Sequence, residues 1–219
     1  MGLPATDANA TNRVGVLIQT FVSTVTLRRK VKALFSQIWP LLISGMLGAG
    51  MGSALASSMR PEVMKIVIAC VMGIMLLLVS TNTKKWLREN DSLPTMGKRS
   101  LMFFLFIGVG FYGGFIQAGV GIFVLASLVL LSEFSLQQAN VFKNFFTFLI
   151  TIPALIIFGL KGQIHWEAGL LLAVGQAFGA WLAARYASDS PKAAKYTHRL
   201  LIVMLLLSGA KMIWDFAAA

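Results

Sequence analysis

Few side chains in this sequence could do chemistry, and the best candidates are amides and cations beside apolar helices. The segment ANVFKNFFT (139–147) places Asn140, Lys143, Asn144 and Thr147 at positions i, i+3, i+4 and i+7. At this spacing the four side chains share one face of a helix. A helix N-terminus offers unpaired N–H groups and about half a positive charge. A lysine and two amides at such a position predict a binding site for a small anion.

The beginning of the chain repeats this arrangement. Asn9, Asn12 and Arg13 open another apolar segment, where amides and a cation again suit an anion. The alternative for Lys143 is structural, with the lysine reaching the lipid headgroups and the amides capping and joining helices. Both halves place a cation beside an asparagine at the same point, and polar residues are otherwise scarce in these spans. We therefore favour the anion site.

A third group of candidates lies in a glycine-rich stretch. The apolar run 101–132 would form a helix of about 48 Å, which exceeds the hydrocarbon core of ~30 Å. Its many glycines weaken a helix locally. We predict two short helices that meet in an unwound turn, although one tilted helix with a glycine packing face is the alternative. The turn would add these residues to the substrate site: Gly113, Gly114, Gln117, Gly119 and Gly121.

The remaining reactive residue types argue against catalysis and metal binding. All eight carboxylates lie in loops or at the ends of apolar runs, so no pair of acids is placed to relay protons or bind a metal within a span. His165 and His198 also lie at span edges, and the single cysteine, Cys70, can form no disulfide within one chain. We expect no enzyme activity, no metal site and no cofactor.

Composition indicates an integral membrane protein built from helices. Of the 219 residues, 57% are hydrophobic and 12% are charged, and the net charge is +11; soluble domains carry about 25% charged residues. Basic residues in short loops between apolar spans contact anionic lipid headgroups, so membrane lipid rather than nucleic acid is the expected partner. The apolar runs that predict the spans are 14–27, 34–56, 63–80, 101–132, 141–160, 166–184 and 200–214.

An internal repeat organises the chain. A shift of 131 residues aligns the two halves without a gap over the first spans, and duplicated bundles are common in transporters, with the site between the halves. The aligned pairs include Asn9–Asn140, Thr20–Thr151 and Gly48–Gly179. We divide the chain into a first helical repeat (1–82), a connecting loop (83–100) and a second helical repeat (101–219). Met1 falls on Ser132 in this register, so the first repeat is expected to lack a counterpart of 101–131.

Loop charges predict that the two repeats have opposite orientations. The basic loop RRKVK (28–32) corresponds to the nearly neutral GLKGQ (159–163), as expected for equivalent loops on opposite membrane faces. When 101–132 is treated as a re-entrant hairpin, basic residues divide most unevenly between the two sides of the membrane, as the positive-inside rule expects. The expected fold is therefore an all-α membrane protein with two inverted pseudo-repeats. Its cytoplasmic loops would be 28–33, 81–100 and 186–196, with Lys161 and the C-terminus on the other side.

The second half resembles the sulfite exporter TauE/SafE family. The resemblance is carried by GVGFYGGFIQAGVGIFVLASLVLL (108–131), QQANVFKN (137–144) and LKGQIHWEAGLLLAVGQAFGAWLAARYA (160–187), and the first half matches more loosely. It implies a multi-pass permease of the bacterial inner membrane for a small sulfur-containing anion such as sulfite, sulfoacetate or another organosulfonate. The alternatives are a structural or assembly subunit and, less favoured, a lipid-modifying membrane enzyme. The sequence leaves open whether the protein forms a homo-oligomer.

Overall fold

The computed structural model describes residues 2–80, 99–131, 134, 136–183 and 185. This part of the chain is entirely helical between its turns, which confirms the all-α expectation. The predicted run 200–214 and the loop 186–196 lie outside the described residues. The helices are α1 (Ala5–Thr26), α2 (Arg28–Ser57), α3 (Pro61–Ser80), α4 (Arg99–Phe115), α5 (Val120–Leu131), α6 (Leu136–Leu160) and α7 (Trp166–Leu182).

Three helices begin several residues before their apolar runs. α1 begins at Ala5, ahead of the run 14–27 and of the upstream start expected near Asn9, α2 begins at Arg28 rather than near residue 34, and α6 begins at Leu136 rather than near residue 141. Hydropathy locates apolar residues, whereas helix bounds follow backbone hydrogen bonds, and arginine and lysine favour a helix as well as leucine does. The basic segment 28–32 is therefore the first turn of α2 and not a loop.

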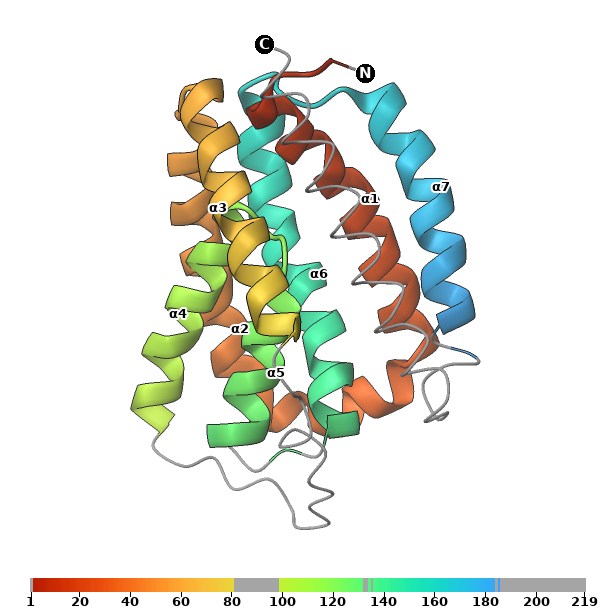
Figure 1. The fold of residues 1–219 in the computed structure, drawn as a ribbon. Coiled ribbons are helices and arrows are strands. Elements are labelled where there is room, and N and C mark those ends of the chain that lie inside the picture. The colour runs from red at the N-terminus through yellow and green to blue at the C-terminus, as the bar shows by residue number, and fades with distance from the viewer. Residues whose placement is uncertain (1, 81–98, 132–133, 135, 184, 186–219) are drawn as a thin grey trace.

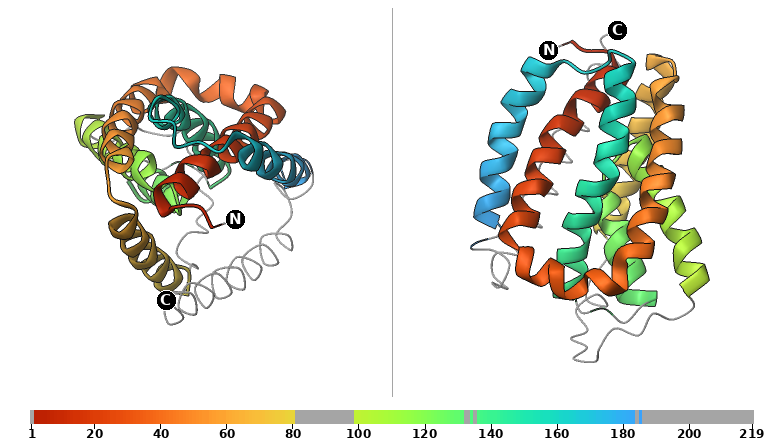
Figure 2. Two further views of the ribbon diagram at one scale, coloured as in Figure 1. Left: turned by 90° about the horizontal axis from the view of Figure 1, so that it is seen from above. Right: turned by 180° about the vertical axis from the view of Figure 1, so that it is seen from behind.

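The helices form a bundle in which direction alternates along the chain (Figure 1). α1 runs away from the N-terminus, the first turns of α2 lie across the far end of the bundle, and the rest of α2 returns (Figures 1 and 2). α6 runs in the opposite direction to α1, and α7 in the opposite direction to the main part of α2. Among the described residues, two stretches are long and apolar enough to span a bilayer by length and composition alone: Ile38–Ser57 and Gln137–Leu160.

The run 101–132 is divided into two helices. α4 ends at Phe115 and α5 begins at Val120, within the predicted interval between Gly113 and Gly121. Gln117 and Gly119 between them have φ angles of 70° and 72°, in the left-handed region that glycine adopts without steric cost. α4 and α5 run in opposite directions, so the start of α4 and the end of α5 lie at the same end of the bundle (Figure 1).

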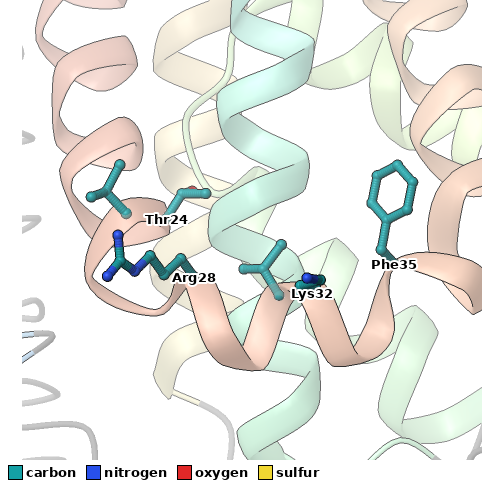
Figure 3. Close-up of a pocket in the computed structure, with 6 residues that line it drawn as sticks. Thr24, Arg28, Lys32 and Phe35 are labelled. Carbon is teal, nitrogen blue, oxygen red and sulfur yellow. The ribbon is translucent and has the colours of Figure 1, made fainter.

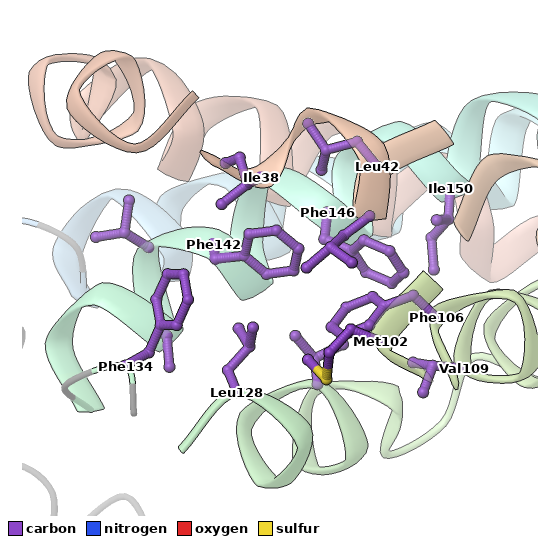
Figure 4. Packing of buried hydrophobic residues seen from close by; sticks show 14 of the residues in the cluster. Ile38, Leu42, Met102, Phe106, Val109, Leu128, Phe134, Phe142, Phe146 and Ile150 are labelled. Carbon is purple, nitrogen blue, oxygen red and sulfur yellow. The ribbon is translucent and has the colours of Figure 1, made fainter. Parts of the chain in front are cut away.

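A buried aromatic cluster holds α4, α5 and α6 against α2 (Figure 4). Phe106 of α4 meets Phe142 and Phe146 of α6 edge to face, with ring centroids 5.5 and 5.2 Å apart. Such tilted pairs place the positive ring edge on the negative ring face and add to the stabilisation that burial provides. This packing fixes α6 beside the break between α4 and α5.

Candidate functional site

Arg13 of α1 is fully buried although it carries a charge. Its guanidinium donates hydrogen bonds to the carbonyl oxygens of Gly113 at 3.0 Å and Gly114 at 2.6 Å, and to Oε1 of Gln117 at 3.1 Å. The guanidinium carbon also lies 4.9 Å from the ring centroid of Phe158. The last carbonyls of a helix have no partners within that helix and form its negative end. Arg13 therefore caps the C-terminal end of α4.

No carboxylate neutralises Arg13 within the described part of the chain. Arg13 forms no ion pair there, and Nε of Arg13 has no hydrogen-bond partner among the described residues. The negative end of α4 offsets only part of a full charge. The helix break therefore carries a buried excess of positive charge, which favours an anion nearby.

Gln117 connects the break to α6. Its Oε1 accepts from Arg13, and its Nε2 donates to Oγ1 of Thr151 at 2.8 Å. The Thr151 hydroxyl donates in turn to the carbonyl oxygen of Thr147 at 2.6 Å. Asn9 adds a further link from α1, because its Nδ2 donates to the carbonyl oxygen of Phe115 at 2.9 Å. These bonds join α1, the break and α6 in one polar chain.

Lys143 approaches the same break from α6. The side chain is half-buried, and its Cδ lies 2.9 Å, and its Cε 3.8 Å, from the position that a Cβ would take on Gly121. Gly121 belongs to the first turn of α5, where backbone N–H groups point out of the helix. Among the described residues, the ammonium group has neither a hydrogen-bond nor an ion-pair partner. An unpaired cation and a helix N-terminus thus converge on one point.

Two further predicted residues complete the surroundings of the break. Thr147 is buried on α6, one turn from Lys143 and one turn from Thr151, so these three side chains share a face that runs along the break. Gly113 faces Ile150 of α6, since a Cβ there would lie 2.6 Å from Cδ1 of Ile150. The face of α6 that carries Lys143 is therefore the one that meets α4 and α5.

Three of the predicted amides do not meet the break through a hydrogen bond. Asn12 is exposed, and its Oδ1 accepts from Nε2 of Gln176 on α7 at 3.3 Å. Asn140 and Asn144 are half-buried on α6, and the described residues supply neither with a hydrogen-bond partner. Both amides, three residues before and one residue after Lys143, thus remain available to a ligand.

Thr151 and Phe158 were not among the predicted site residues. The sequence does contain a signal for Thr151, because it aligns with Thr20 in the repeat and follows Thr147 by one helical turn. Phe158 carries no such signal, since an aromatic residue in an apolar helix is indistinguishable from an ordinary core residue. Its contact with Arg13 depends on how α1 packs against α6.

Comparison with known proteins shows to which family this chain is related. The sequence profile described as "Sulfite exporter TauE/SafE" matches residues 1–212. The chain is 27% identical over 220 residues to "Probable membrane transporter protein YfcA" of Escherichia coli strain K12, covering 98% of this chain and 78% of that protein. It is 25% identical over 218 residues to "Probable membrane transporter protein ORF9" of Sinorhizobium sp, covering 98% and 80%.

A third relative is "Probable membrane transporter protein" of Haemophilus influenzae, 26% identical over 217 residues and covering 98% of this chain and 82% of that protein. No solved structure matches the chain significantly. The names of the relatives agree with the helical, apolar character of the fold and describe transporters rather than enzymes. Since the profile extends over nearly the whole sequence, the chain belongs to the sulfite exporter TauE/SafE family of membrane proteins.

Proposed function

We propose that this protein is a secondary transporter of the bacterial inner membrane for a small sulfur-containing anion such as sulfite, sulfoacetate or another organosulfonate. The anion binds at the break between α4 and α5. The observation that carries this proposal is Lys143, whose side-chain stem lies beside Gly121 in the first turn of α5 and whose ammonium group has no partner among the described residues. A sulfonate or sulfite group presents several oxygens that accept hydrogen bonds from both donors at once.

The surroundings of Lys143 also favour an anion. Arg13 adds a buried positive charge at the C-terminal end of α4, and no described carboxylate compensates it. Asn140 and Asn144 lie three residues before and one residue after Lys143, where their amides can donate to oxyanion oxygens. When the anion binds, hydrogen bonds from fixed donors in a positively charged site would thus replace its hydrogen bonds to water.

The arrangement of the helices supports inverted repeats around this site. α1 and α6 run in opposite directions, as do α2 and α7, and each pair is related by the 131-residue register (Figure 1). In this proposal α4 and α5 form a re-entrant hairpin of the second repeat (101–219), which faces the first repeat (1–82) across Arg13. Alternating access would follow from rocking of one repeat against the other.

The experiment is anion flux into proteoliposomes that contain Lys143→Met. Methionine keeps much of the apolar stem and removes the charge, so insertion and folding are expected to survive. Charge-assisted hydrogen bonds contribute about 1.5–3 kcal/mol each, so loss of Lys143 should weaken the apparent affinity for sulfite or sulfoacetate about ten- to a hundredfold. Lys161→Met is the matched control, because Lys161 is exposed in the turn between α6 and α7.

Both variants are compared with the parent protein at equal membrane abundance, with sulfate as a third anion. Normal flux in Lys161→Met and strongly reduced flux in Lys143→Met would support the site. Normal flux in both variants would refute the role of Lys143, and the absence of flux in the parent protein for every sulfur anion tested would refute the transport proposal itself.

A further inference from the structure

A second candidate site lies at the elbow where α1 meets α2, at the end of the bundle away from the N-terminus (Figure 3). An open pocket of about 630 Å³ occupies this corner. Its walls come from the last turns of α1 and the first turns of α2, and α6 passes behind it (Figure 3). The lining residues are Thr24, Val25, Arg28, Val31, Lys32 and Phe35.

The polar part of this pocket is cationic and unneutralised. Arg28 and Lys32 are exposed and lie one helical turn apart on α2, and the described residues place no carboxylate within ion-pair distance of either. The sequence holds no acidic residue between Asp7 and Glu62. The C-terminal end of α1 and the N-terminal end of α2 meet here, so their partial charges oppose each other, and the two side-chain cations supply the positive charge that suits a phosphate group.

Thr24 of α1 also lines the pocket. Its Oγ1 is buried and has no hydrogen-bond partner within the part of the chain that the structure describes. Buried hydroxyls are nearly always hydrogen-bonded. Rotation of the Thr24 side chain would be needed to bring this hydroxyl group to a ligand oxygen in the pocket.

The remaining lining residues are apolar, and two of them are exposed. Val25 and Phe35 expose 47% and 49% of their surface. Trp39, 50% exposed, shares the helix face of Arg28, Lys32 and Phe35, because these four positions are spaced i, i+4, i+7 and i+11. The face therefore combines cations with exposed apolar and aromatic side chains, as is typical of helices at a membrane interface.

We infer that this pocket binds an anionic phospholipid, with the phosphate between Arg28 and Lys32 and an acyl chain along Val25 and Phe35. The first turns of α2 lie across the end of the bundle (Figure 1), as a helix in the plane of the interface would. A free phosphate ion would use only the cations and would leave the adjoining apolar surface in water. The combination of charge and exposed apolar surface therefore favours the lipid. This site is separate from the anion site at Lys143 and does not depend on it.

The test measures binding of phosphatidylglycerol to the purified full chain by native mass spectrometry, with phosphatidylcholine as the neutral comparison. The variant Arg28→Gln/Lys32→Gln removes both cations of the pocket. The matched control, Arg29→Gln/Lys30→Gln, removes two charges from the same segment at exposed positions that do not line the pocket. We expect phosphatidylglycerol to bind about ten- to thirtyfold more weakly to the pocket variant, and the control to stay within about twofold of the parent.

Equal losses in the two double variants would overturn the proposal, because they would indicate diffuse attraction to a basic surface. Displacement of phosphatidylglycerol by glycerol phosphate or inorganic phosphate at matched concentration would also overturn it, since the acyl chain would then contribute nothing. Arg28→Lys/Lys32→Arg keeps both charges and should bind like the parent. A loss in this variant, with normal elution on size exclusion, would likewise contradict the pocket.

Discussion

Arg13 and Lys143 are cations beside the same helix break, yet their surroundings give them different roles. The guanidinium of Arg13 meets two carbonyl oxygens and Gln117, whereas the ammonium of Lys143 has no partner among the described residues. A planar guanidinium can satisfy several fixed acceptors at once, and a lysine is a flexible point charge. Arg13 thus positions the end of α4, and Lys143 remains free for the substrate in our proposal.

This difference predicts that the two cations contribute unequally to the stability of the fold. Arg13→Met should lower the free energy of unfolding by about 2–4 kcal/mol, because the carbonyls of Gly113 and Gly114 and the amide of Gln117 lose a buried donor. The free energy of unfolding of Arg13→Lys should lie between those of the parent and Arg13→Met. Lysine keeps the positive charge but lacks the planar guanidinium group that reaches several acceptors at once. Lys143→Met should change stability little. Thermal unfolding of the purified variants in detergent measures all three, and equal stability of Arg13→Met and parent would contradict the capping role.

The contact between Lys143 and Gly121 predicts coupling between these two residues. A Cβ on Gly121 would lie 2.9 Å from Cδ of Lys143, so Gly121→Ala should displace the lysine and reduce anion flux. The flexible side chain can move, so the fold should persist. In the Lys143→Met background, Gly121→Ala should reduce flux much less. A double-mutant cycle should then give an interaction free energy of about 1 kcal/mol or more between the two substitutions. Independent effects in the double variant would show that Gly121 acts by another route.

At the scale of helices, close contact between α2 and α4 depends on small residues. A Cβ on Gly110 would fall on the backbone of Gly45, and a Cβ on Gly114 would fall on the backbone of Ala49. Helices in membranes gain most of their association energy from such close packing. The glycines of α4 therefore serve the contact with α2 as well as the break before α5.

Two glycines of α4 test this packing. Gly110→Ala should destabilise the protein by about 1–3 kcal/mol, because the new methyl group must push α2 and α4 apart. Gly108→Ala meets nothing within 4 Å and should be neutral or stabilising by up to about 1 kcal/mol, since alanine favours a helix more than glycine does. Both are compared by thermal unfolding. Equal destabilisation by the two alanines would argue that helix propensity, not helix contact, governs this segment.

In the whole molecule, two segments that are equivalent in the internal repeat lie at opposite ends of the bundle. The start of α2 and the connection between α6 and α7 lie at opposite ends (Figure 1), as the contrast between the basic segment 28–32 and the neutral segment 159–163 predicts. This placement supports inverted repeats in a membrane. The positive-inside rule predicts that the basic end, which holds the proposed lipid pocket, faces the cytoplasm.

Cysteine labelling tests this topology. In a Cys70→Ser background, a membrane-impermeant maleimide should label Gly162→Cys in intact spheroplasts. It should label Lys30→Cys only after permeabilisation, because basic loops stay in the cytoplasm. Ser188→Cys should behave like Lys30→Cys if α4 and α5 form a re-entrant hairpin. Labelling of Gly162→Cys and Ser188→Cys from the same side would contradict the inverted arrangement.

The sequence by itself determined the helical class and the division of the run 101–132. Composition and run length are properties of the local chain, and the glycines between Gly108 and Gly121 weaken one long helix wherever it packs. The sequence also identified cations and amides at the starts of α1 and α6 as candidates for an anion site. It placed the starts of α1 and α2 too late, because hydropathy does not register polar residues that are helical.

Only the tertiary structure decided what each polar side chain contacts. Arg13 meets Gly113, and Asn12 meets Gln176, across 100 and 164 residues of chain. Adjacent residues on one helix point in directions about 100° apart, so the neighbouring helices decide which side chain is buried. The packing of α1 between α6 and α7 therefore turned two adjacent candidates into a buried cap and an exposed amide, a distinction that no spacing in the sequence contains.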